Sequence, residues 1–337
     1  MIISRTPLRI SFLGGGTDYP AYFQRYGGAT LVAAIDKYTV LTVHRLMQFA
    51  DHRIRIHYSQ VESVQRLEEI RHPSARECLR FMGVDGGIEI HYVSDLPART
   101  GLGSSSSATV GLLHALHRVK GESVNREQLA AEAVHVEQRL IGERVGCQDQ
   151  YACAIGGLSQ LEFHPDGHVT AHPVALDAVQ LELLREHLLL LYTGIQRDAH
   201  LVLQEQLERT AAGDNTDALH RLKALVGESR DVLANGKDLT AFGRLLHEGW
   251  MLKRELSSRV STSWIDDLYR RALTAGAVGG KLLGAGSGGF LLLFVEPSKR
   301  GAVRQALQLR EVEFAFEREG SRIIFHEEVG RDGTTSE

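Results

Sequence analysis

The chain has 337 residues, of which 43% are hydrophobic and 24% are charged. This balance is typical of a soluble globular protein, and the length suggests two domains or one bilobal unit. The net charge of −4, from 38 basic and 42 acidic residues, excludes a strongly basic binder of nucleic acid or anionic membranes.

The apolar runs and the cysteines narrow the class of protein further. The longest apolar runs, 188–192 and 290–295, are far shorter than the roughly 20 residues of a membrane span. Arg5 and Arg9 interrupt the N-terminal segment where a signal peptide would need apolar residues. The three cysteines form no CxxC pair, which argues against a disulfide framework or a zinc site. We expect a cytoplasmic protein without nucleic-acid or membrane partners.

The first half of the chain has the alternating pattern of half-buried strands, interrupted by a few helices. Strands are predicted over residues 8–12, 30–43, 53–58, 87–93 and 158–163. Helical spacing of apolar residues predicts helices from Ser104 onward, over 126–140, and over 149–155 with a glycine stop at 156–157.

The second half is richer in helix. Helices are predicted over 198–210, 217–234, 239–256, 263–275 and 298–309, and strands over 187–192, 278–283, 290–295, 312–316 and 322–326. Because neither half alternates strand and helix regularly, the pattern favours a two-lobed α+β architecture over a doubly wound sheet. We place the boundary between Phe163 and Glu186.

The strongest local signal is the stretch PARTGLGSSSSA at residues 97–108. A predicted strand leads into a Gly-x-Gly turn, and a helix opens at the serines. Free N–H groups at a helix N-terminus attract phosphate, and Gly101 and Gly103 allow the backbone to approach it closely. One serine would suffice as a helix cap, so four in succession predict a phosphate-binding loop rather than a simple cap.

Two other glycine-rich stretches fail as nucleotide motifs. Residues 276–282 (GAVGGKL) lack one spacer of a Walker loop and have leucine where a magnesium-binding Ser or Thr belongs. Residues 284–289 fit G-x-G-x-x-G, yet a strand-like run follows them where the dinucleotide fingerprint requires a helix.

Two further stretches combine charged residues with glycine. Residues 14–20 (GGGTDYP) follow Arg9, which interrupts an apolar strand face, and Asp18 can accept hydrogen bonds from two hydroxyls of a sugar. A helix cap is the alternative for this stretch. Glu137 and Asp149 flank GERVGCQ, and Asp149 lies in a compact setting that is unusual for a solvated carboxylate.

In their order, R-x-P-x-R…GGGTDYP, P-x-x-x-GLGSSSSA and KLLGAGSGG resemble the three signature motifs of the GHMP small-molecule kinases. The resemblance extends over nearly the whole chain. It implies an N-terminal lobe like domain 2 of ribosomal protein S5 over 1–175, a ferredoxin-like C-terminal lobe with added helices over 176–330, and a polar tail over 331–337. ATP would lie between the lobes.

The resemblance also implies roles for individual residues. Asp149 matches the catalytic base and Arg9 the arginine beside it, while Ser105 and Glu137 match the ligands of Mg²⁺. The remaining matches are to residues that bind ATP phosphates (Gly101, Leu102, Gly103, Ser104, Ser105, Ser106, Gly284, Ala285 and Gly286) and to residues that contact the substrate (Gly16, Thr17, Asp18 and Arg197).

Within the family, GGGTDYP, GCQDQYACAIGG and LYTGIQRDAH most resemble the kinases that phosphorylate the C1 hydroxyl of D-glycero-D-manno-heptose 7-phosphate. A 7-phosphate needs a cationic pocket, for which Arg197, Lys37 and Arg99 are the candidates. The alternatives are a 1-kinase for a neutral sugar, a sugar sensor without activity, and a homoserine-kinase-like enzyme. Galactokinase matches less well, because it has Glu-His at Gly15-Gly16. The resemblance allows a homodimer.

Overall fold

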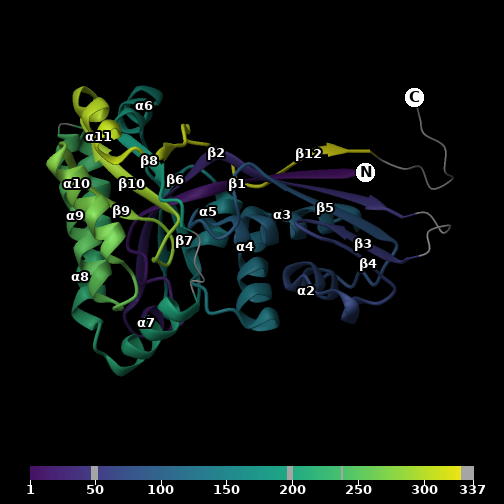
Figure 1. Cartoon of the computed structure of the whole chain (residues 1–337). Helices are drawn as coiled ribbons and strands as arrows, with labels where there is room; N and C mark the ends of the chain where they lie inside the picture. The colour runs from purple at the N-terminus through teal and green to yellow at the C-terminus, as the bar shows by residue number, and fades with distance from the viewer. Residues whose placement is uncertain (47–51, 196–199, 237, 328–337) are drawn as a thin grey trace.

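The computed structural model describes residues 1–46, 52–195, 200–236 and 238–327 (Figure 1). The first lobe is built on an eight-stranded sheet. Its strands are β1 (Ile2–Leu13), β2 (Gly28–Arg45), β3 (Ile54–His57), β4 (Val61–Val64), β5 (Ile88–Ser94), β6 (Leu158–Phe163), β7 (Val169–Pro173) and β12 (Arg322–His326). They follow the order β12-β1-β2-β5-β3-β4, while β6 pairs with both β2 and β7.

Helices cover one face of this sheet. They are α1 (Pro20–Tyr26), α2 (Pro73–Phe81), α3 (Ser104–Val119), α4 (Arg126–His135), a π-helix η2 (Val136–Ile141), α5 (Gln148–Ile155) and a 3₁₀ turn η1 (Leu67–Glu69). Alternate residues of β3 and β5 are buried beneath them, as the period of a strand requires. The apolar core of this lobe therefore lies between the sheet and α2 to α5.

The second lobe has a four-stranded antiparallel sheet. Its strands are β8 (Leu188–Tyr192), β9 (Ala277–Leu282), β10 (Phe290–Val295) and β11 (Arg310–Glu311), in the order β11-β8-β10-β9. This order, with helices after the first and third strands, is ferredoxin-like. The helices are α6 (Ala178–Glu186), α7 (His200–Ala212), α8 (Thr216–Asn235), α9 (Leu239–Glu255), α10 (Ser263–Thr274), η3 (Pro297–Lys299) and α11 (Arg300–Leu307).

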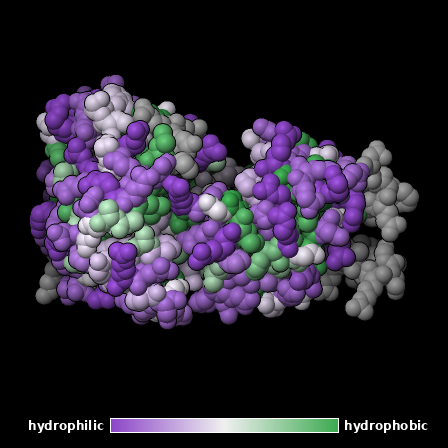
Figure 2. Space-filling model, turned by 90° about the horizontal axis from the view of Figure 1, so that it is seen from below, coloured by the Kyte–Doolittle hydropathy of each residue, from purple (hydrophilic) through white to green (hydrophobic). Residues whose placement is uncertain are grey.

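The two lobes share one apolar cluster. It joins alternate residues of β1 and β2 to residues of β8, β10, α8 and α9. At its centre the rings of Phe12 on β1 and Phe242 on α9 lie 5.5 Å apart in an edge-to-face arrangement. Figure 2 shows the surface hollowed between the two parts of the molecule. The shared core fixes the two walls of this hollow relative to each other.

The predicted α+β architecture is confirmed. The strands around the two glycine-rich stretches also agree with our rejection of both as nucleotide-binding motifs. Residues 277–282 form β9, and β10 begins directly after Gly289. The strand predicted at 312–316 is wrong: this segment makes only a single bridge, from Phe316 to Ile35, and the strand lies at Arg310–Glu311 instead. The helix predicted over 126–140 is α-helical only to His135.

Several short elements escaped the sequence patterns, namely α1, α2, α6, β4, β7 and η1. Both α1 and α2 begin at a proline, which fits the first turn of a helix, but each spans at most nine residues. Segments this short show too few turns for an apolar face to recur. Among the described residues, no helix is long and apolar enough to cross a membrane.

We expect Phe242→Ala to lower the free energy of unfolding by about 3–5 kcal/mol, because the ring is fully buried between the lobes and its loss leaves a cavity. Urea unfolding followed by circular dichroism measures the change. The control is Val179→Ala, whose side chain is 76% exposed and whose loss should shift stability by at most about 0.5 kcal/mol. Equal stability of the two variants would contradict a core shared between the lobes.

Candidate active site

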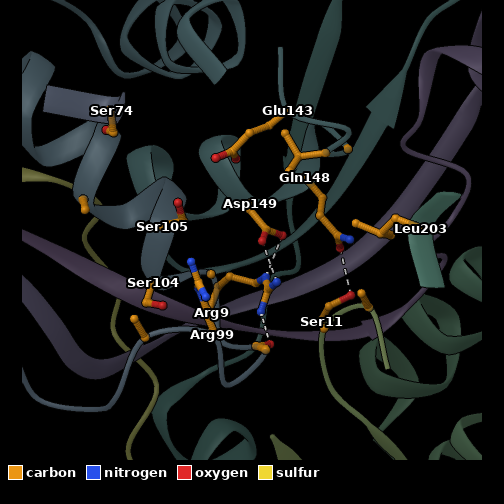
Figure 3. Close-up of a pocket in the computed structure, with 18 of the residues that line it drawn as sticks. Arg9, Ser11, Ser74, Arg99, Ser104, Ser105, Glu143, Gln148, Asp149 and Leu203 are labelled. Atoms are coloured by element: carbon orange, nitrogen blue, oxygen red, sulfur yellow. Dashed lines mark hydrogen bonds and ion pairs between the residues drawn. The ribbon is translucent and has the colours of Figure 1, made fainter. Parts of the chain in front are cut away.

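A cavity of about 860 Å³ opens between the lobes and is lined by both of them. The first lobe contributes residues of β1, the loop after it, the glycine-serine loop and the start of α5. The second lobe contributes Leu203 and Gln206 from α7, Lys253 from α9, and Lys281 and Gly284 beside β10. Figure 3 shows Asp149 in the middle, with Ser104 and Ser105 on one side and Ser11, Gln148 and Leu203 on the other.

Arg9 and Asp149 form a two-pronged ion pair at the centre of the cavity. The Nε of Arg9 donates to Oδ1 of Asp149 at 2.8 Å, and Nη2 donates to Oδ2 at 2.6 Å. The third guanidinium nitrogen, Nη1, donates to the carbonyl of Gly101 at 2.7 Å. Burial alone would lower the pKa of Arg9, but the carboxylate of Asp149 raises it, so the guanidinium remains charged. Arg9 thus holds both the carboxylate and the glycine-serine loop.

The glycine-serine loop presents the N-terminus of α3 to the cavity. The cap residue Gly103 is left-handed, with φ of 74°, and has no side chain to accept hydrogen bonds from the first turn. Its Cα also lies against Arg9, where a Cβ would meet Cγ at 3.0 Å. The N–H groups of the first turn therefore face the cavity with the partial positive charge that binds phosphate.

The third glycine-rich motif lies directly against this loop. A Cβ on Gly101 would be 2.5 Å from the carbonyl oxygen of Leu283, and a Cβ on Gly284 would be 2.5 Å from the Cα of Gly101. Both residues also have positive φ. Only glycine allows this approach between the two backbones. The second lobe thus supports the loop that the first lobe supplies.

Asp18 lies on the other side of Asp149, at 1% exposure. Its Oδ1 accepts from the N–H of Gly16 at 2.9 Å, and Gly146 leaves room for Oδ2, which a Cβ there would approach to 1.8 Å. Burial raises the pKa of Asp18 to about 6. Gly16 and Asp18 line the cavity, whereas Thr17 does not: its hydroxyl lies 2.8 Å from the carbonyl oxygens of Gly14 and Ala29.

Glu137 is 1% exposed and lies on the π-helix, an irregularity that is frequent at functional sites. Its Oε2 accepts hydrogen bonds from Ser106 at 2.9 Å and from Gln150. Its Oε1 is buried without a hydrogen-bond partner, and burial raises the pKa of the carboxyl to about 7. A buried carboxylate oxygen that lacks a partner is what a divalent cation would complete, so this residue fits a ligand of Mg²⁺.

The two residues predicted to hold Mg²⁺ differ in position: Ser105 lines the cavity, whereas Glu137 is not among the lining residues. The side chain of Ser105 is exposed in the cavity, and Ser106, predicted only to bind phosphate, is the serine that contacts Glu137. Other predicted residues also lie behind the cavity surface. These are Leu102, which is fully buried and receives the N–H of Arg9 at its carbonyl, and Gly286, which packs on Val260.

The three candidates for a second phosphate pocket differ in their position relative to the cavity. Arg197 lies outside the described residues. Lys37 pairs with Asp36 at 2.8 Å and does not line the cavity. Arg99 lines the cavity and has a φ of 62°, unusual for a residue with a side chain.

Two buried lysines were missed from the sequence. Lys253 on α9 donates to the carbonyls of Leu282 and Gly284, and Lys281 on β9 donates to the carbonyl of Phe12 at 2.9 Å. Burial lowers the pKa of Lys253 to about 8 and that of Lys281 further below its usual range. Lys253 continues the buried face of α9, which includes Leu246 and Trp250. A lysine at a core position was the signal that could have found it.

Aromatic rings form the wall beyond Ser105. His72 stacks on Tyr92 with ring centroids 5.0 Å apart and meets Tyr58 edge-on at 4.8 Å. All three residues line the cavity, as do Arg71 and Ser74. Flat rings next to a phosphate-binding helix end suit a base. The motifs did not indicate this wall, because its residues come from a loop and two strand ends far apart in the sequence.

The chain belongs to the GHMP kinase family, and it is a phosphotransferase. Residues 69–157 match the GHMP kinases N terminal domain, and residues 222–311 match the GHMP kinases C terminal model.

One curated relative is the D-glycero-alpha-D-manno-heptose 7-phosphate kinase of Campylobacter jejuni, which is 28% identical over 95% of this chain and 97% of its own length. The galactokinase of Pyrococcus furiosus is 25% identical over 92% of this chain and 93% of its own. Among solved structures, a D-glycero-D-manno-heptose 1-phosphate kinase from Bacteroides thetaiotaomicron superposes with a TM-score of 0.80 at 25% identity, covering 97% of this chain and 99% of the other.

The raised pKa of Glu137 predicts a pH-dependent stability. The folded-state pKa of about 7 exceeds the ordinary value of 4.5, so the free energy of unfolding falls as the pH rises from about 4.5 through 7. Between pH 4.5 and 8 without divalent cations, we expect the wild type to lose about 3 kcal/mol more than Glu137→Gln. Urea unfolding at several pH values measures this. Glu68→Gln, at an exposed position, is the control and should follow the wild type. If the free energies of unfolding of wild type and E137Q changed in parallel with pH, the raised pKa of Glu137 would be contradicted.

Proposed function

We propose that the protein transfers the γ-phosphoryl group of ATP to the C1 hydroxyl of D-glycero-D-manno-heptose 7-phosphate. The observation that carries the proposal is the Arg9–Asp149 ion pair, which lies between the free N-terminus of α3 and the buried carboxylate of Asp18. A charged base thus stands between a phosphate-binding end and a hydroxyl-binding end of one cavity.

Asp149 accepts the proton of the attacking hydroxyl in this proposal. The sugar oxygen forms a bond to the γ-phosphorus as the bond from that phosphorus to the bridging oxygen breaks, and ADP leaves with the electron pair. Both carboxylate oxygens of Asp149 are held by Arg9, which orients the carboxylate. Because Arg9 also holds the carbonyl of Gly101, the base keeps a fixed position relative to the phosphate loop.

Charge on the phosphates is met by the first turn of α3, with Gly101 and Gly103 allowing the close approach. Glu137 and Ser105 are the residues proposed to hold Mg²⁺, which when bound neutralises charge on the β- and γ-phosphates. The ring wall of Tyr58, His72 and Tyr92 suits the adenine.

The acceptor side is assigned from Asp18 and the relatives. Asp18 faces the cavity with its carboxylate fixed by Gly16, so it is placed to accept hydrogen bonds from sugar hydroxyls. The heptose 7-phosphate kinase among the relatives supports a heptose phosphate. A kinase for a neutral sugar is the second candidate, because Lys253 and Lys281 already donate to backbone carbonyls and so have fewer N–H groups free for a second phosphate.

We expect Asp149→Asn to lower kcat by about 10²- to 10⁴-fold, because the amide cannot accept the proton, while KM for ATP changes little. Steady-state kinetics with ATP and Mg²⁺ measure both constants. Glu143→Gln is the matched control: it changes another acidic side chain of the cavity that makes no contact with Arg9 in the described structure. Near-normal turnover of D149N would remove Asp149 as the base.

The acceptor is tested by ADP release with D-glycero-D-manno-heptose 7-phosphate, free heptose, mannose, fucose, galactose and homoserine. We expect kcat/KM to be highest for the 7-phosphate by at least about tenfold, since charge-assisted hydrogen bonds to a phosphate are stronger than those to a neutral hydroxyl. A preference for a neutral sugar would keep the kinase and overturn the phosphorylated acceptor. Binding of a sugar without turnover would favour a sensor.

A further inference from the structure

A cluster of two histidines and a glutamate lies on the face of the first sheet that is turned away from the cavity. His57 on β3 pairs with His91 on the parallel strand β5, and Glu89 lies two residues before His91 on the same face. The next residues, Tyr58 directly after β3 and Tyr92 on β5, line the cavity instead. The cluster is thus directly behind the ring wall.

The three side chains converge on one point. The Nε2 atoms of His57 and His91 lie 2.8 Å and 3.0 Å from the same oxygen, Oε1 of Glu89. The two imidazole rings are stacked, with centroids 4.0 Å apart and an angle of 7° between the planes. One potential ligand atom from each residue lies within 4.8 Å of the others.

The donor set is that of a zinc site. Two imidazole nitrogens and one carboxylate oxygen are ligands that Zn²⁺ prefers, and three protein ligands leave a fourth position for water. The side chains are 24%, 17% and 41% exposed for His57, Glu89 and His91, so an ion can enter from solvent. His44 stands opposite Glu89 on β2 and on the same face, one cross-strand position from the cluster.

We propose that His57, Glu89 and His91 bind a divalent transition metal ion, preferably Zn²⁺. The bound ion links β3 to β5 behind the ring wall of the cavity. The ion would add a second link between the edge hairpin of β3 and β4 and the rest of the sheet. It would thereby restrain Tyr58 and Tyr92, which follow two of its ligands directly. The site is separate from Glu137 and does not depend on the acceptor of the kinase.

Arg55 sets the strength of this site. Its Nε lies 3.9 Å from Oε1 of Glu89, which is too far for a hydrogen bond. This Nε is buried without a hydrogen-bond partner. The guanidinium therefore places a positive charge beside the cluster without occupying the ligands. A cation that binds there is repelled by Arg55, so removal of this charge should tighten binding.

The test is a calorimetric titration of the whole, metal-stripped protein with Zn²⁺ in millimolar Mg²⁺, which saturates sites that prefer hard oxygen ligands. We expect one equivalent to bind the wild type, with affinity at least about tenfold weaker in His57→Gln and in His91→Gln, since each removes a ligand. Arg55→Gln should bind more tightly. The matched control is His172→Gln. His172 on β7 pairs with Glu162 on β6, and this variant should bind Zn²⁺ like the wild type.

The melting temperature gives a second readout. Because the altered side chains are at least partly exposed, all variants should melt within a few degrees of the wild type in EDTA, and Zn²⁺ should raise the melting temperature of wild type and H172Q but not of H57Q or H91Q. Absence of binding to the wild type would overturn the proposal. Equal Zn²⁺ affinity of wild type, H57Q and H91Q would overturn it as well.

Discussion

The active site depends on one partly buried ion pair, Arg9 with Asp149. A guanidinium at 3% exposure is costly to bury, and the two hydrogen bonds to Asp149 together with the bond to Gly101 satisfy it. Since Arg9 extends from the middle of β1, the central scaffold of the first lobe positions both the base and the phosphate loop. Removal of Asp149 leaves the buried charge of Arg9 unpaired, so its effect on stability and on turnover would be linked.

Around this pair, the second lobe adds positive charge to that of Arg9 and Arg99. Lys253 and Lys281 reach the cavity from α9 and β9, and both interact electrostatically with Asp18. Burial raises the pKa of Asp18 and lowers the pKa values of both lysines, because charge is poorly solvated in this cavity. A bound phosphate would favour the charged form of the lysines, since an opposite charge nearby stabilises an ammonium group.

Backbone contact between the lobes adds a geometric constraint. The close approach of Gly101 and Gly284 exists only while the shared core around Phe12 and Phe242 holds the two sheets together. A change in that core would therefore move the phosphate loop without touching it. The same logic applies at the far end of the cavity, where Tyr58 and Tyr92 are carried by two strands that the His–Glu–His cluster also joins.

The sequence by itself determined the α+β class, most long elements and the local motifs, because amphipathic periodicity and glycine-serine turns are encoded over a few neighbouring residues. It also indicated Arg9 and Asp149, through motif resemblance. Only the tertiary structure placed these two in contact and put Ser106, rather than Ser105, against Glu137. It alone brought Lys253 and Lys281 to the cavity. The reason is physical: burial and charge partners arise from packing between segments that lie 29 to 269 residues apart, and no local pattern records them.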